Sequence, residues 1–109
     1  MKIWVDDVRP APADYIWIKS VNEFKEFIVD RLIAENFALN FGGNPDAVEL
    51  IDLDHDAGDF AKDGGDYIKI LDWLESISQS YPIRIHSMNP VGVSNMRAII
   101  RRNGWKEVA

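Results

Sequence analysis

Cysteine is absent from the 109-residue sequence, so disulfide bonds and thiolate chemistry are excluded. Long apolar runs are also missing, and none approaches the ~20 residues that a membrane-spanning helix needs. The N-terminal segment reaches Asp6 and Asp7 too early for a secretory signal peptide. These absences predict a cytoplasmic protein that has no membrane partner.

Basic residues are scarce, because 12 Lys and Arg face 18 Asp and Glu and give a net charge of −6. This balance argues against a broad nucleic-acid-binding surface, although it allows a local basic site for one phosphate. A hydrophobic content of 47% is typical of a globular chain. At this length we expect a single domain, residues 1–109.

Strands and helices are expected to alternate along the chain. Strands are predicted at Lys2–Asp6, Tyr15–Ile18, the apolar part of Leu50–Gly58, Tyr81–Ile85 and Trp105–Val108. Helices are predicted from Ser20, from near Asp66 and from Asn89-Pro90 to Asn103-Gly104. Phe37–Asp46 reads as a loop, and Val8–Asp14, with two prolines, replaces the first crossover helix.

This alternation predicts an α/β fold, with a parallel sheet of about five strands and helices on both faces. Ligands of such sheets bind beyond the carboxyl ends of the strands. Polar clusters follow three of the predicted strands: Asp6-Asp7, Asp54-His55-Asp56 and His86-Ser87-Met88-Asn89. We therefore expect all three clusters to line one pocket.

Carboxylates dominate that expected pocket. Asp6, Asp7, Asp54 and Asp56 offer hard oxygen ligands, and a bound cation would offset their mutual repulsion. This donor set predicts a divalent cation, with Mg²⁺ or Mn²⁺ ahead of Ca²⁺. The alternative is a solvated acidic loop in which Asp7 or Asp56 only caps a turn.

The two histidines of the chain, His55 and His86, both fall in this pocket. Imidazole titrates near neutral pH, so a facing pair could divide the roles of general base and general acid. The competing use of the pair is a zinc site with an Asp as third ligand.

Anion-binding groups are predicted beside the carboxylates. Arg9 is the nearest cation for a phosphate, unless it pairs with one of the Asp residues. Asn89 precedes the third helix, whose free amides can bind an anion, or it serves only as a cap. Arg97, Arg101 and Arg102 are interpreted as a mostly solvated face of that helix.

Four segments together resemble a known family, the cyclic-phosphate-processing receiver-like domains. They are Asp6-Asp7-Val8-Arg9-Pro10-Ala11-Pro12, Leu53-Asp54-His55-Asp56, Gly65-Asp66-Tyr67 leading to Asp72-Trp73-Leu74, and His86-Ser87-Met88-Asn89-Pro90-Val91-Gly92 with Asn95-Met96. The resemblance covers nearly the whole chain and keeps the order of the motifs. It departs at Asp52, where a small residue is expected, and at Ala57, where a larger apolar residue is usual.

The resemblance implies a three-layer, receiver-like (flavodoxin-like) fold and a role in processing cyclic phosphate ends of RNA or nucleotides. The residues that match the motifs are Asp6, Asp7, Arg9, Asp54, His55, Asp56, His86, Ser87 and Asn89. On this basis we predict a metal-assisted phosphoesterase. His55, His86 and Asp54 would be catalytic, Arg9, Ser87 and Asn89 would bind phosphate, and Asp6, Asp7, Asp54 and Asp56 would hold the metal.

Phosphoacceptor receivers are similar in the paired Asp on strand one, the Asp after strand three and the Ser after strand four. Asp54 could therefore accept a phosphoryl group in signalling, or the domain could bind a phosphorylated ligand without hydrolysing it. The Lys expected after strand five has no clear counterpart, since Lys106 lies within the last predicted strand. A third hypothesis is a structural protein whose acidic strand ends bind metal only for stability.

Overall fold

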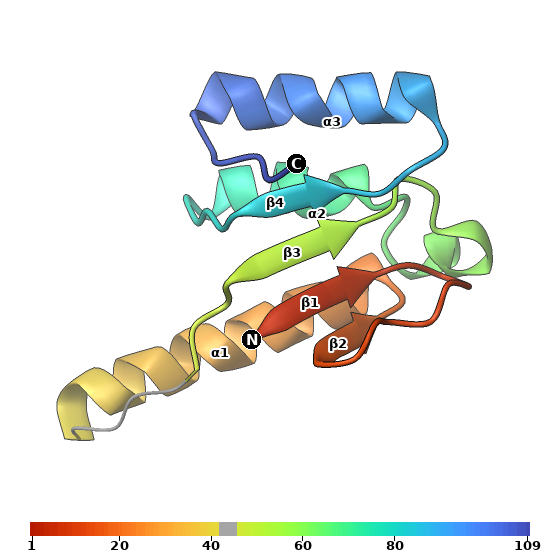
Figure 1. Ribbon diagram of the computed structural model, residues 1–109. Helices are drawn as coiled ribbons and strands as arrows, with labels where there is room; N and C mark the ends of the chain where they lie inside the picture. The colour runs from red at the N-terminus through yellow and green to blue at the C-terminus, as the bar shows by residue number, and fades with distance from the viewer. Residues whose placement is uncertain (42–45) are drawn as a thin grey trace.

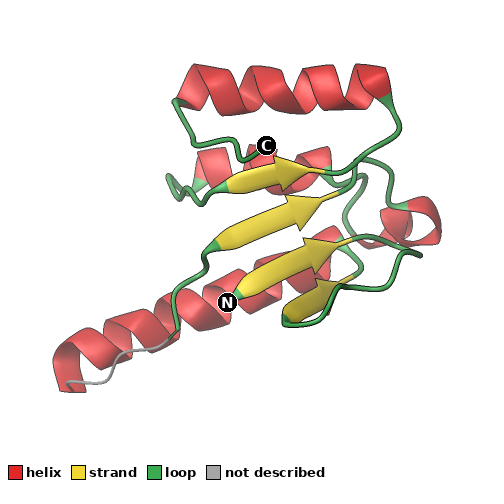
Figure 2. Cartoon of the chain, in the orientation of Figure 1, coloured by secondary structure: helices red, strands yellow, loops and turns green. Residues whose placement is uncertain are grey.

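Four parallel strands form the sheet in the computed structural model, which describes residues 1–41 and 46–109. Their order across the sheet is β2 (Tyr15–Ile18), β1 (Lys2–Val5), β3 (Leu50–Leu53) and β4 (Ile83–Ile85), and all four point the same way (Figure 2). The predicted parallel α/β fold is confirmed, with four strands rather than about five.

The segment predicted as a fifth strand, Trp105–Val108, makes only one bridge, between Glu107 and Ile83 of β4. The amide of Ile83 donates to the carbonyl of Lys106 at 3.0 Å, and the amide of Val108 donates to the carbonyl of Ile83 at 2.7 Å. Both hydrogen bonds are made by Ile83. They hold the segment against β4, but a single bridge does not make it a fifth strand.

Three α-helices follow the strands: α1 (Val21–Phe41), α2 (Ile68–Ser76) and α3 (Pro90–Asn103) (Figure 1). A short 3₁₀ helix, η1 (Gly58–Asp63), precedes α2. The connections from β2 to β3 and from β3 to β4 step in the same direction across the sheet. Right-handed crossovers therefore place their helices on the same face. Consistent with this, α2 contacts both α1 and α3.

One hydrophobic core lies between this face and the three helices. The strands contribute the fully buried Ile3, Val5, Ile51, Leu53 and Ile83, and the helices contribute Phe24, Ile28, Leu71, Leu74 and Met96. The alternation of side chains along each strand explains the selection, since residues two apart share a face.

The opposite face of the sheet carries the side chains of the alternate residues in each strand. Trp4 is in register with Trp17 and Asp52, and Asp52 is in register with Arg84, so all four side chains lie on this side. The chain between β1 and β2 lies against it, because the indole N–H of Trp4 donates to the carbonyl of Arg9 at 2.9 Å. Among the described residues no helix covers this face, so the molecule has two layers where three were expected.

The ends of the helices follow the predicted capping chemistry. The Ser20 hydroxyl accepts the amide of Glu23 at 3.0 Å, and the Glu23 carboxylate accepts the amide of Lys19 at 3.2 Å. Gly104 ends α3 with φ of 65°, a left-handed conformation that favours glycine.

One boundary was predicted wrongly. Phe37–Asp46 was expected to be a loop, but α1 continues to Phe41 and extends past the sheet (Figure 1). The residues that precede Gly42 are mostly good helix formers, and no Gly or Pro interrupts them. Residues 42–45 of the expected loop lie outside the described residues. None of the described helices is long and apolar enough to cross a membrane.

Candidate functional site at the carboxyl edge of the sheet

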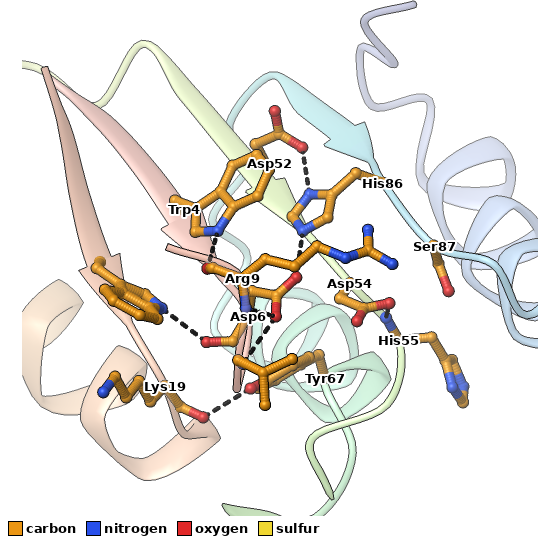
Figure 3. A network of polar contacts seen from close by, with 12 residues as sticks. Trp4, Asp6, Arg9, Lys19, Asp52, Asp54, His55, Tyr67, His86 and Ser87 are labelled. Carbon is orange, nitrogen blue, oxygen red and sulfur yellow. Dashed lines mark hydrogen bonds and ion pairs between the residues drawn. The ribbon is translucent and has the colours of Figure 1, made fainter. Parts of the chain in front are cut away.

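Backbone hydrogen bonds continue past the strands and align the residues that follow them. The amide of Asp54 donates to the carbonyl of Val5 at 3.0 Å, and the amide of His86 donates to the carbonyl of Leu53 at 2.9 Å. Asp6, Asp54 and His86 therefore sit side by side at the carboxyl edge of three adjacent strands (Figure 3).

A carboxylate trio, Asp6, Asp7 and Asp54, occupies this edge. Each residue offers one oxygen, and the three oxygens lie within 4.8 Å of one another. Asp6 is fully buried, and its Oδ1 accepts the amides of Val8 at 3.0 Å and of Arg9 at 2.8 Å. These amides belong to the turn that leaves β1, so the Pro-containing connection itself holds Asp6 in place.

Asp7 depends on a glycine opposite it. The Oδ2 atom of Asp7 lies so close to Gly58 that a Cβ at this position would collide with it, and Gly58 has φ of 54°. Both the space and the left-handed backbone therefore require glycine here. The structure thus places the start of η1 against the carboxylate trio.

The electrostatics of the trio differ between its members. Burial alone would raise the pKa of Asp6, but the amides of Arg9 and Val8 and the imidazole of His86 outweigh it and lower the pKa. Burial raises the pKa of Asp7, and the negative charges of Asp6 and Asp54 raise it further. A divalent cation would relieve this repulsion, so the donor set fits a hard metal ion.

His86 is enclosed by side chains from β1 and β3 and from the residue that follows β1. Its Nδ1 lies 2.6 Å from Oδ1 of Asp52, and its Nε2 lies 3.0 Å from Oδ2 of Asp6. The ring stacks on Trp4, with centroids 3.8 Å apart and an angle of 6° between the planes. Burial would lower the pKa of His86, but the hydrogen-bonded carboxylates of Asp52 and Asp6 outweigh it and raise the pKa. The geometry thus favours an imidazolium that donates to both carboxylates.

Asp52 is the site residue whose role the sequence left open. It is 2% exposed, in the middle of β3, and its Oδ2 lies 3.6 Å from Nη1 of Arg84. The available signal was a single charge inside the apolar run Leu50–Leu53, which indicates a buried and paired carboxylate. Its partner could not be identified, because the strand order was unknown.

His55 belongs to a second group on the helix side. Its Nδ1 donates to Oδ1 of Asp56 at 2.9 Å, and Nε2 has no hydrogen-bond partner among the described residues. The ring packs so closely against Gly92 of α3 that a Cβ there would overlap it. The side chain of His55 therefore has a fixed position with one ring nitrogen available.

Asp56 does not join the carboxylate trio as expected. It lies with His55 and Asp66, and ligand atoms of these three residues are within 4.8 Å of one another. Asp66, which was not predicted as a site residue, also accepts the amide of Ala57 at 3.0 Å. Among the described residues these two trios are the groups that could hold a metal ion.

Asn89 caps α3, which is one of the two roles that the sequence left as alternatives. Its Oδ1 caps α3 by accepting the amide of Gly92 at 3.0 Å. This orientation turns Nδ2 toward Asp56, at 3.4 Å from Oδ1. Ser87 supports the arrangement, because its hydroxyl accepts the amide of Asn89 at 3.2 Å. The first turn of α3 is thus tied to the His55 group.

The predicted site residues all lie at this edge, but the two imidazoles do not face each other. Figure 3 shows the ring of His86 beside Trp4 and Asp52, whereas the ring of His55 points away on the far side of Asp54. In the same view the exposed side chain of Arg9 extends from the β1 turn toward His86 and Ser87. A proton relay between the two histidines is therefore not what the geometry provides.

The parallel sheet and the polar residues after β1, β3 and β4 define a receiver-like α/β domain. The chain belongs to the family described as the cyclic-phosphate processing receiver domain, whose family model matches residues 1–102. No curated protein and no solved structure matches the chain.

Proposed function

We propose that the protein is a metal-assisted phosphoesterase that opens the cyclic phosphate of a nucleotide or an RNA end. The observation that supports this most is the carboxylate trio at the carboxyl edge of the sheet, followed directly in the chain by His55, whose Nε2 has no hydrogen-bond partner among the described residues. The family description adds the substrate class, since it refers to cyclic-phosphate processing.

The metal would be held by Asp6, Asp7 and Asp54, each through one oxygen, and Mg²⁺ or Mn²⁺ suits these ligands. When bound, such a cation supplies charge stabilisation on the phosphoryl oxygens and favours ionisation of a bound water. Asp6 has further hydrogen bonds to His86 and to two amides, so its orientation is set before any ligand arrives.

His55 acts as the general base, because its Nδ1–H bond to Asp56 leaves Nε2 to take a proton. Water adds to phosphorus and gives one proton to His55, and one P–O bond of the ring breaks. The released alkoxide oxygen takes a proton from solvent water, and His55 returns its proton to solvent, so the net reaction consumes one water. His86 positions Asp6 rather than moving the proton. Arg9, Ser87 and Asn89 provide the donors for the phosphate oxygens.

The test is turnover of a 2′,3′-cyclic nucleotide with Mg²⁺, followed by ³¹P NMR. His55→Ala should lower kcat by about 10² to 10⁴-fold, the range typical of a lost general base. Asp54→Asn should also lose activity because the metal site loses a ligand. Asp30→Asn, the same charge change on the exposed side of α1, should leave turnover unchanged.

Two results would contradict the proposal: no turnover by the wild type with either Mg²⁺ or Mn²⁺, or full turnover by His55→Ala. The second candidate function is phosphoacceptor signalling, favoured by the position of Asp54 beside Asp6 and Asp7. Incubation with acetyl phosphate and mass spectrometry would then reveal an acyl phosphate on Asp54, and Asp54→Asn would abolish it.

A further inference from the structure

A groove of about 570 Å³ lies between the carboxyl end of β4 and α3. Its polar lining consists of Ser87, Ser94, Arg97 and Arg101, and no Asp or Glu of the described residues lines it. This composition is unusual in a chain with a net charge of −6. The groove is therefore a local basic surface beside an acidic site.

The arginines of α3 differ in how their charge is compensated. Arg102 pairs with Glu75 at 2.8 Å outside the groove, and Arg97 pairs with Glu107 at 2.9 Å. Arg101, in contrast, has no ion-pair partner in the part of the chain that the structure describes. Arg97 and Arg101 are four residues apart on one helix face, where like charges repel. Glu107 already compensates Arg97, so Arg101 is the cation that an anion in the groove would pair with.

The edge of β4 adds backbone donors and acceptors. Ile83 uses its amide and carbonyl toward Lys106 and Val108, while the amide of His86 points toward β3. By the alternation of a parallel strand, the amide and carbonyl of Ile85 point outward into the groove. Together with the hydroxyls of Ser87 and Ser94, they can bind phosphate oxygens and ribose hydroxyls. Met88, 85% exposed, offers an apolar surface for a base.

The groove reaches the carboxyl edge of the sheet at Ser87. Ser87 lines the groove and also accepts the amide of Asn89, whose side chain reaches Asp56 beside His55. In Figure 3, Ser87 and His55 both lie on the side of Asp54 that faces away from Trp4. A chain of phosphates lying along α3 would thus bring its terminal group to His55.

We propose that this groove binds the phosphodiester strand that precedes a cyclic phosphate end. The preferred substrate is then a single-stranded oligonucleotide rather than a free cyclic mononucleotide. This inference rests on the proposed function. It also fits the overall negative charge, because only the few phosphates nearest the end meet a basic surface.

The test is fluorescence anisotropy with 5′-labelled RNA that carries a 3′-phosphate, a stable end, in a hexanucleotide and in a dinucleotide. The wild type should bind the hexanucleotide about tenfold more tightly, as expected for a few additional phosphate contacts. Arg101→Ala should remove most of this advantage and reduce the slope of log K against log salt by about 0.7, the value for one contact to a single strand. Ser94→Glu, which places a negative charge in the groove, should do the same.

Arg102→Ala is the matched control, with the same charge change on the same helix but outside the groove. It should leave the affinity for the hexanucleotide unchanged. The inference is overturned if the wild type binds both RNAs equally, if Arg102→Ala weakens binding as much as Arg101→Ala, or if an acidic peptide competes as well as the hexanucleotide.

The two proposals fail separately. Binding of the hexanucleotide that depends on Arg101, without turnover of any cyclic phosphate in ³¹P NMR, would retain the groove and reject the phosphoesterase. Turnover of a cyclic mononucleotide, without any advantage for the longer RNA, would retain the phosphoesterase and reject the groove.

Discussion

The two histidines have the same side-chain exposure, 14%, and entirely different surroundings. His86 has a carboxylate on each ring nitrogen and an indole on its face. His55 has one carboxylate partner, Asp56, whose side chain is 59% exposed, and its Nε2 has no hydrogen-bond partner in the described part of the chain. Burial alone therefore does not distinguish the two imidazoles, whereas the number of fixed partners does.

Substitutions at His86 and its partners are expected to have the largest effect, which is a loss of folding stability. His86→Ala leaves Asp6 and Asp52 buried without their partner, so we expect a loss of about 3 kcal/mol in the free energy of unfolding. Asp52→Ala should cost a similar amount, and the double variant less than the sum. Asp56→Ala, at the exposed partner of His55, should cost less than about 1 kcal/mol. Urea denaturation measures all four, and equal losses at Asp52 and Asp56 would contradict the comparison.

A smaller effect is expected from moving His55 without removing it. Gly92→Ala adds a methyl group that overlaps the His55 ring, and such overpacking costs about 1 to 3 kcal/mol. The better helix propensity of Ala offsets part of this, so we expect a net loss of about 1 kcal/mol. The ring resonances of His55 should shift in NMR spectra, and activity should fall. Asn95→Ala, on an exposed position of α3, is the control, and unchanged His55 resonances in Gly92→Ala would refute the contact.

The smallest effect is the pH dependence of stability in metal-free protein. Because the pKa of His86 is raised in the folded state, its stabilisation is complete below the unfolded pKa of about 6.5. It is lost as the pH rises through the folded pKa, so Tm should fall above neutral pH. The lowered pKa of Asp6 acts in the acid range, and its stabilisation is lost as the pH falls below about 3.8. In His86→Gln the decline of Tm above neutral pH should flatten, and an identical decline would show that another group titrates.

Local signals predicted the elements well. Ser20 and Asn89 begin α1 and α3 as capping residues, and Gly104 ends α3, because these features depend on a few neighbouring residues. The placement of Asp6, Asp54 and His86 at one edge also followed from the sequence. A parallel sheet brings strand ends together whatever the order of the strands.

The missed features depend on which strands are neighbours. The polar partners of Asp52 are Arg84 on β4 and His86 after β4, and no local pattern encodes which strand lies beside β3. The order of the strands also decides which face each helix covers, because the side of a right-handed crossover depends on the direction in which it steps across the sheet. The sequence does not encode this order, so it predicts helices on both faces. The position of Asp56 with His55 rather than Asp6 reflects the turn after β3, which spacing alone does not describe.

The stack of Trp4 on His86 has a consequence for how this chain can change over generations. Trp4, Asp6, Asp52 and His86 come from three separate segments, and the first three all contact the ring of His86. Replacement of one member leaves a buried charge without its partner or exposes an aromatic ring. A single substitution is therefore destabilising, whereas replacement of all four residues together avoids this loss. Descendants of this chain should therefore inherit the quartet intact or lose it as a whole.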